Sequence, residues 1–95
     1  MLNKKVIIRG NKSGVFFGTL AEKNGTEVRL TDCRRLWYWE GANSISQLAA
    51  EGTKNPYGCK FTISVPEIVI TDVLEIIPCT DEAIKSIEGV KVWKM

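Results

Sequence analysis

Short runs of apolar and β-branched residues, separated by polar turns, dominate the first third of the chain. Residues 4–9 (KKVIIR) are rich in β-branched residues and end at the glycine-containing segment 10–14. Two further runs, 15–20 and 26–31, flank Lys23-Asn24-Gly25. Because Asn-Gly readily takes the positive φ angles of a type I′ turn, this spacing predicts a β-hairpin. The pattern as a whole predicts three strands joined by tight turns.

Further extended segments follow. Gly18, inside the second run, predicts a bend or a close approach of two backbones. Thr31-Asp32 predicts a break or bulge, after which residues 34–39 continue as a fourth strand or a strand end. Later in the chain, residues 60–65 and 67–77 are again β-rich.

Two runs have the period and the end signals of helices. In residues 44–52, Ser44 and Gln47 have the spacing of a capping box, and the apolar positions form one stripe. Residues 80–88 begin with Thr80 as an N-cap, carry acids in the first turn and precede a glycine. The sequence therefore predicts two short helices.

These elements predict a single domain over residues 1–95 of the α+β class, mainly β. Its core would be a small, strongly bent antiparallel sheet or an SH3-like β-barrel, accompanied by the two short helices. A local pattern resembles the first motif of Sm-like barrels, and it consists of Gly18-x-Leu20, Asn24-Gly25, Val28-x-Leu30 and Cys33. That resemblance implies a strongly bent small barrel.

Composition narrows the class of protein. With 44% hydrophobic and 25% charged residues, the chain is ordinary for a globular domain. It contains no apolar run long enough for a membrane span, and its N-terminus lacks the apolar stretch of a signal peptide. We therefore expect a cytoplasmic protein that does not enter membranes.

The charges are unevenly distributed along the chain. Residues 1–60 contain ten Lys and Arg and five acids, whereas residues 61–95 contain three Lys and six acids. A basic region of this kind attracts anionic ligands, or it can meet the acidic region of a second copy. A homo-oligomer is therefore expected, and small domains have a general incentive to form one.

Residue types that support catalysis are scarce. The chain has no histidine, and its three cysteines are widely spaced and form no CxxC pair. Neither a nucleotide-phosphate loop nor a metal-loop pattern is present. We expect a protein that is not an enzyme and holds neither a metal nor a cofactor.

Residues 34–39 (RRLWYW) place two arginines and three large aromatics in six consecutive positions. If the segment is extended, Arg35, Trp37 and Trp39 share one face, and Arg34, Leu36 and Tyr38 share the other. The aromatics could simply be core residues, with the arginines paired to neighbouring acids. However, both faces of a strand cannot be buried without burying an arginine. At least one face should therefore meet solvent, a ligand or another subunit.

Much of the chain resembles an uncharacterised family of small bacteriophage proteins. The resemblance is carried by Arg9-Gly10, Ser13-Gly14-Val15-Phe16-x-Gly18-x-Leu20, Cys33-Arg34-Arg35-Leu36-Trp37-Tyr38-Trp39-x-Gly41-Ala42, Ser44-Ile45-x-Gln47-Leu48-Ala49, Cys59-Lys60-Phe61 and residues 72–78. It implies a phage setting, in which the protein would act in the host cytoplasm. Small phage proteins without catalytic residues often act by binding, including the sequestration of nucleotide signals of host immunity.

The leading hypothesis is a non-catalytic protein that binds a phosphorylated, nucleotide-like small molecule, since arginines suit phosphates and aromatic rings stack on bases. The alternatives are a nucleic-acid-binding small barrel and a phage interaction or structural component that uses the same segment as an interface. The expected ligand-binding residues are Arg34, Arg35, Trp37, Tyr38 and Trp39, supplemented at the start of the first helix by Asn43, Ser44 and Gln47.

Overall fold

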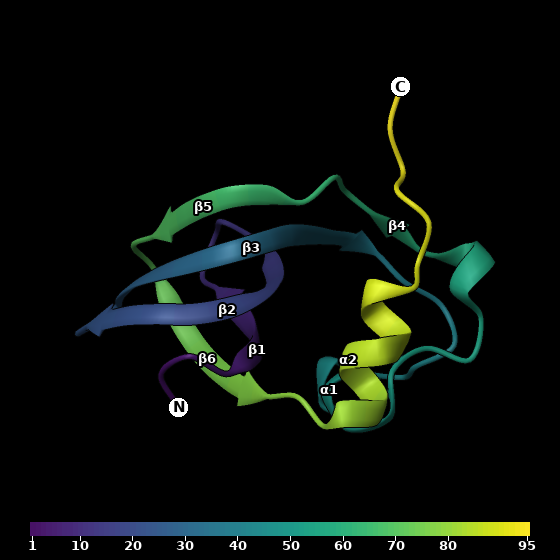
Figure 1. Cartoon of the computed structure of the whole chain (residues 1–95), viewed down its shortest axis with the longest axis horizontal. Helices are drawn as coiled ribbons and strands as arrows, with labels where there is room; N and C mark the ends of the chain where they lie inside the picture. Colours follow the sequence, from purple (N-terminus) through teal and green to yellow (C-terminus); the bar gives the residue numbers. More distant parts are fainter.

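The structure, a computed structural model, describes residues 1–95. Six strands, two α-helices and one 3₁₀ turn follow one another along the chain (Figure 1). Their order is β1 (Lys5–Gly10), β2 (Val15–Asn24), β3 (Glu27–Tyr38), α1 (Ile45–Glu51), η1 (Pro56–Gly58), β4 (Lys60–Phe61), β5 (Val65–Ile70), β6 (Val73–Pro78) and α2 (Asp81–Glu88). The prediction of an α+β, mainly-β domain with two short helices is confirmed.

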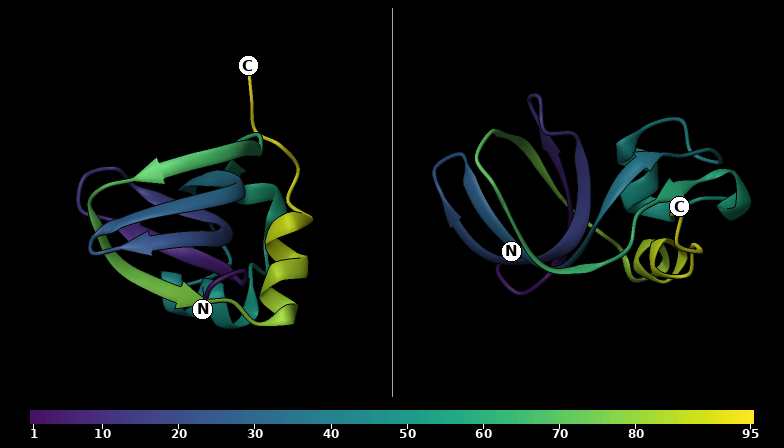
Figure 2. Two further views of the ribbon diagram at one scale, coloured as in Figure 1. Left: turned by 60° about the vertical axis from the view of Figure 1, so that its left-hand side comes forward. Right: turned by 90° about the horizontal axis from the view of Figure 1, so that it is seen from above.

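All six strands belong to one antiparallel sheet in the order β4-β3-β2-β1-β6, and β5 also pairs with β3. The sheet curls strongly, and both helices lie beyond its outer side (Figure 2). Since β5 and β6 do not pair with each other, the sheet stays open. Of the two architectures predicted from the sequence, the strongly bent sheet is therefore observed, and a closed barrel is not.

The third and fourth predicted strands form one continuous strand, β3. Asp32 has a φ of +47°, and the register between β2 and β3 shifts between Phe17 and Thr19. The ladder therefore bulges near Asp32, as the sequence predicts, and continues into the arginine and aromatic residues. Opposite this bulge Gly18 lies so close to β3 that an added Cβ would come within 2.5 Å of the Cys33 Cβ. The predicted close approach at Gly18 is confirmed.

The predicted hairpin is present, but the predicted turn type is wrong. Asn24 and Glu27 face each other, so the two turn residues are Gly25 and Thr26. Gly25 has a φ of +63°, whereas Thr26 does not have a positive φ. A type I′ turn needs positive φ at both central residues, and a single glycine at the first central position is the pattern of type II′. The turn is therefore one residue later than the Asn-Gly signal indicates.

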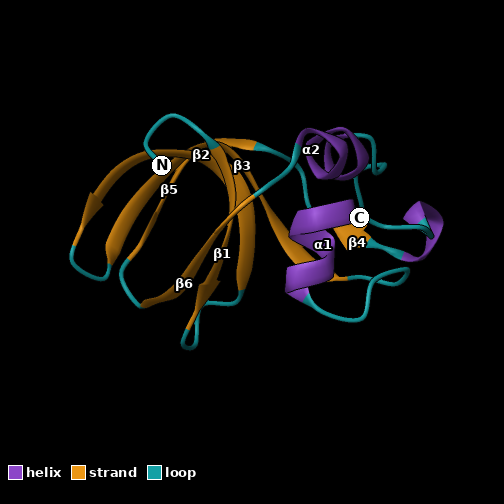
Figure 3. Cartoon of the chain, turned by 90° about the horizontal axis from the view of Figure 1, so that it is seen from below, coloured by secondary structure: helices purple, strands orange, loops and turns teal.

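The curved sheet packs on both sides. On its inner side, eight buried residues from β1, β2, β3 and β5 form one cluster, which includes Phe16 and Leu30. On its outer side, a second cluster joins the sheet to the helices and includes Phe17, Leu48 and Ile87. Figure 3 shows α1 and α2 against this outer side. Two hydrophobic cores thus share one sheet, and residues on opposite faces of β1, β2 and β3 serve different cores.

Both helices begin where the caps predict. Ser44 Oγ accepts a hydrogen bond from the Gln47 N–H at 3.2 Å, and Thr80 Oγ1 accepts one from Ala83 at 3.1 Å. Gly52 follows α1 with a φ of +78°, a conformation that glycine adopts without strain. Neither helix has the length and apolar character that spanning a bilayer requires.

Candidate functional site

Arg34 points to the helix-covered side of β3 and is only 5% exposed. Its guanidinium donates to four backbone carbonyls at 2.9–3.1 Å, those of Phe61, Thr62, Ile87 and Val90. It also lies over the Phe61 ring, at 5.4 Å from the ring centroid. Burial lowers the pKa of Arg34 from its ordinary value. Four of its five N–H groups are thus directed into the fold, and the side chain otherwise only borders a pocket that Lys5, Asp32 and Glu88 also line.

Arg35 points to the opposite side of the same strand and is half-buried. Its guanidinium lies over the Phe16 ring at 4.5 Å from the centroid, and Nη1 donates to the Ser13 carbonyl at 2.6 Å. No acidic side chain pairs with it. Nε and Nη2 donate to no protein group. Arg35 is thus a positioned cation with donors left to offer.

The remaining arginines make Arg35 distinct. Arg9 pairs with Glu75, and Arg29 pairs with Glu22 and Glu67. Of the four arginines in the chain, Arg35 alone lacks both a carboxylate partner and a full set of carbonyl acceptors. An uncompensated, partly desolvated guanidinium is the kind of group that binds an anion strongly.

A groove of about 370 Å³ lies beside Arg35, between β3 and the turn that joins β1 to β2. Trp37 and Trp39 supply its aromatic wall, and Trp37 is 65% exposed. Lys12 adds a second cation from the turn. No acid lines the groove, whose residues are Lys12, Ser13, Gly14, Val15, Arg35, Leu36, Trp37 and Trp39. The three residues predicted to share one face therefore line one groove.

The turn that carries Lys12 is fixed by Asp72, a residue of the corner between β5 and β6. The Asp72 carboxylate accepts hydrogen bonds from the Lys12 N–H at 2.8 Å, the Ser13 N–H at 3.1 Å and the Ser13 hydroxyl at 2.6 Å. The hydrogen bond from the Ser13 hydroxyl, followed by the one from the Lys12 backbone, lowers the pKa of Asp72. This carboxylate thereby holds one wall of the groove in place.

Tyr38 lies outside the groove, in a separate cluster at the end of β3. Its hydroxyl donates to Glu40 at 2.8 Å, and this contact raises the pKa of Tyr38. The Lys60 ammonium lies between the rings of Tyr38 and Trp93, at 5.7 and 5.6 Å from their centroids. Tyr38 is therefore an exposed aromatic of another surface, apart from Arg35.

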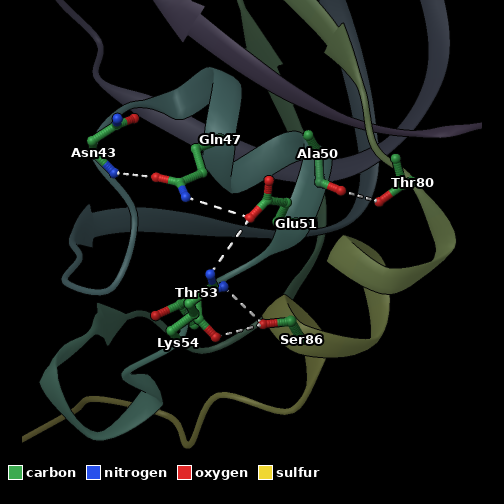
Figure 4. Close-up of polar contacts among 8 residues, drawn as sticks. All are labelled: Asn43, Gln47, Ala50, Glu51, Thr53, Lys54, Thr80 and Ser86. Carbon is green, nitrogen blue, oxygen red and sulfur yellow. Dashed lines mark hydrogen bonds and ion pairs between the residues drawn. The ribbon is translucent and has the colours of Figure 1, made fainter.

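The predicted contacts at the start of α1 serve the helix itself. Gln47 Oε1 accepts from the Asn43 N–H at 2.8 Å (Figure 4). The Ser44 hydroxyl donates to Asn43 Oδ1 at 2.8 Å. Gln47 Nε2 reaches toward Glu51 at 3.4 Å. None of Asn43, Ser44 and Gln47 lines the groove. Their polar atoms cap α1, so the structure does not bring them to the arginine and tryptophan residues.

Five groove residues were not predicted as site residues: Leu36, Val15 and the turn residues Lys12, Ser13 and Gly14. The glycine-rich segment 10–14 signals a turn, yet nothing near it in sequence indicates that the turn faces β3. Gly14 has a φ of +110°, a backbone conformation that residues with a Cβ rarely adopt, and it lies next to Arg35 Nη1. One signal could have identified the turn residues. The turn contains Lys12 between two glycines, and it precedes β2, the strand that pairs with the RRLWYW segment of β3.

The groove offers cationic donors and aromatic faces but no conventional catalytic group. The chain contains no cluster of three or more acidic or cysteine side chains that could hold a metal. Cys33 and Cys59 are buried, and burial raises the pKa of Cys79 to about 11. The arrangement therefore presents positive charge and flat aromatic faces at one groove.

Comparisons with known proteins give the family of the chain. The search of curated proteins and the search of solved structures gave no match. One family model matches residues 3–87, which include every residue of the groove. The family that matches has no known function, and this fits the resemblance to an uncharacterised family noted in the sequence. The chain belongs to the family described as a domain of unknown function, DUF6948.

Proposed function

We propose that the groove binds a phosphorylated, nucleotide-like small molecule without changing it chemically. The main support for this proposal is Arg35. It is half-buried, it lacks an acidic partner, and its Nε and Nη2 make no hydrogen bond beside two tryptophans. Lys12 provides a second positive charge for the same anion. The exposed ring of Trp37 offers a face on which a base can stack.

The biological setting follows from the sequence resemblance to small phage proteins. In that setting, a binding protein without catalytic groups would act by holding its ligand away from a host receptor. A nucleotide used as an immune signal is a ligand of this chemistry. Sequestration is then measured as the loss of free nucleotide in proportion to added protein.

The test is titration of the protein with a panel of mono-, di- and cyclic nucleotides, followed by tryptophan fluorescence and by calorimetry. We expect at least one nucleotide to change Trp37 emission. Arg35→Met should weaken its binding about tenfold or more, because a charged hydrogen bond contributes about 1.5–3 kcal/mol. Trp37→Ala should weaken it by a similar factor through lost stacking.

Arg9→Met is the matched control, because it removes the same charge from an exposed ion pair that lies outside the groove. It should leave the affinity unchanged. A silent nucleotide panel, or an equal loss in both arginine variants, would contradict the proposal. Affinity that grows with oligonucleotide length and falls steeply with salt would instead identify a nucleic-acid-binding module.

A further inference from the structure

The two outer strands of the bent sheet leave their edges unpaired. β5 pairs only with β3, and β6 pairs only with β1. The residues Thr71 and Asp72 join the two strands at a corner, so the open edges belong to consecutive elements (Figures 1 and 2). Unpaired edges present backbone donors and acceptors that a further strand can use.

On β6, the outward groups can be assigned from one hydrogen bond. The Cys79 N–H donates to the Lys5 carbonyl at 3.1 Å, and Ile77 and Glu75 follow in the same register with β1. Alternate residues of an antiparallel strand face opposite neighbours. The backbone groups of Leu74 and Ile76 therefore point away from β1, and neither N–H donates a hydrogen bond elsewhere in the protein.

On β5, the assignment follows from the β2–β3 hairpin. Asn24 and Glu27 close this hairpin, so Glu27 and Arg29 face β2, and the alternate residues Val28 and Leu30 face β5. Their partners on β5 are Ile70 and Ile68. The intervening residues Glu67 and Val69 therefore direct their backbone groups outward, again without another acceptor for either N–H. Each edge thus offers two free donors.

Neither edge carries the unpaired charges that usually prevent strand addition. Glu67 is held by Arg29 of β3, and Glu75 is held by Arg9 of β1. The exposed side chains that remain are aliphatic. Val69 on β5 is 51% exposed, and Leu74 on β6 is 53% exposed. Both edges therefore combine free hydrogen-bonding groups, neutralised charge and exposed apolar surface.

We propose that β5 of one copy pairs with β6 of a second copy, so that identical chains assemble head to tail. Both edges are free on every copy. A symmetric contact between two identical edges would leave the other edge of each chain exposed, whereas a head-to-tail contact uses both. Closing such a chain of contacts into a ring leaves no free edge. This inference is independent of the nucleotide-binding proposal, because no edge residue lines the groove.

Native mass spectrometry and light scattering test the assembly. The wild-type protein should have a mass of two or more times that of its 10.6 kDa chain. Val69→Pro and Leu74→Pro each remove an N–H that points outward while leaving the bonds to β3 and β1 intact, since proline is tolerated on edge strands. Each variant alone should be a single chain. Val69→Thr and Leu74→Thr keep the N–H and should keep the assembly.

A mixture of the two proline variants distinguishes the kinds of contact. In a head-to-tail contact, the intact β6 of Val69→Pro can pair with the intact β5 of Leu74→Pro. The mixture should therefore form dimers containing one chain of each variant, although neither variant associates alone. Dimer formation also shows that both variants are folded.

Three results would overturn the proposal. A wild-type protein that remains a single chain over the accessible concentration range would exclude it. If Leu74→Pro alone still formed dimers, the contact would be β5 with β5; if Val69→Pro alone did so, it would be β6 with β6. Finally, folded proline variants, verified by circular dichroism, that assemble like the wild type would show that the interface lies elsewhere.

Discussion

On the helix-covered side of β3, Arg34 is enclosed by four carbonyl oxygens, whereas on the opposite side Arg35 lies at an open groove with one carbonyl contact. The two residues are adjacent in sequence and chemically identical. They differ in the protein groups that surround each guanidinium on its side of the strand. One side meets the backbone carbonyls of β4 and of the end of α2, and the other meets a glycine-bounded turn. The same side chain therefore serves structure on one side and is available for binding on the other.

Replacing Arg34 tests the structural side of this comparison and should have the largest effect. Arg34→Ala removes the guanidinium donor from four carbonyls, three of them in buried surroundings, and only those of Phe61 and Ile87 keep a backbone donor, from Trp93 and Val90. We expect a loss of about 4 kcal/mol in the free energy of unfolding. Urea denaturation followed by circular dichroism measures it. Arg9→Ala, which breaks an exposed ion pair, should cost no more than about 1 kcal/mol.

The close approach of β2 to β3 tests the inner side of the sheet. In Gly18→Ala the new Cβ would lie 2.5 Å from Cys33 Cβ and 3.0 Å from its Cα, so the strands must separate. We expect destabilisation of about 2–3 kcal/mol. Differential scanning calorimetry would show a lowered melting temperature. An unchanged melting temperature would mean that the two strands are not held this closely in solution.

Replacing Arg35 should affect stability least of the three changes. Arg35→Met gives up one hydrogen bond and a cation–π contact with Phe16 but keeps an apolar stem over the ring. The expected loss is about 1 kcal/mol in the same urea assay. Its effect on nucleotide affinity should be larger than its effect on stability. The reverse ranking would place Arg35 with Arg34 as a structural residue.

The hydrogen bonds that Asp72 accepts from the turn at Lys12 and Ser13 should make the melting temperature depend on pH in the acid range. Hydrogen bonds from Ser13 and the Lys12 backbone lower the folded pKa of Asp72, so the unfolded state binds protons more readily. The contribution is complete above the unfolded carboxyl pKa and is lost as pH falls through the lower folded pKa. Melting temperature measured against pH should show this acid-dependent loss in the wild type. In Asp72→Asn that component should be absent.

Features governed by residues close in sequence were predicted well. Ser44 and Thr80 mark the starts of the helices because their hydroxyls bond amides three residues later. The hairpin was also located correctly, because its signal, Asn24-Gly25, lies within the turn region itself. Its turn type was predicted wrongly, because Asn24 pairs with Glu27 and the turn is therefore centred on Gly25 and Thr26.

The choice between the two faces of RRLWYW depends on residues far away in sequence. Alternation gives two equivalent faces, each with an arginine and aromatics. The carbonyls of Ile87 and Val90, more than fifty positions later, select Arg34 for burial. The groove likewise needs Asp72 to hold the turn at Ser13. Distant contacts of this kind leave no periodic signal in the sequence, so the face carrying the candidate site could not be chosen from it.

The four contacts of Arg34 also set an order of events during synthesis. Residues 87 and 90 leave the ribosome more than fifty residues after Arg34, and until then two of its carbonyl acceptors do not exist. Strands β1, β2 and β3 can already pair, because all their residues precede position 39. The helix-covered core, in contrast, can be completed only when nearly the whole chain has emerged. A nascent chain stalled before residue 87 would carry Arg34 next to an unfinished core, where its charge favours continued exposure to water over premature collapse.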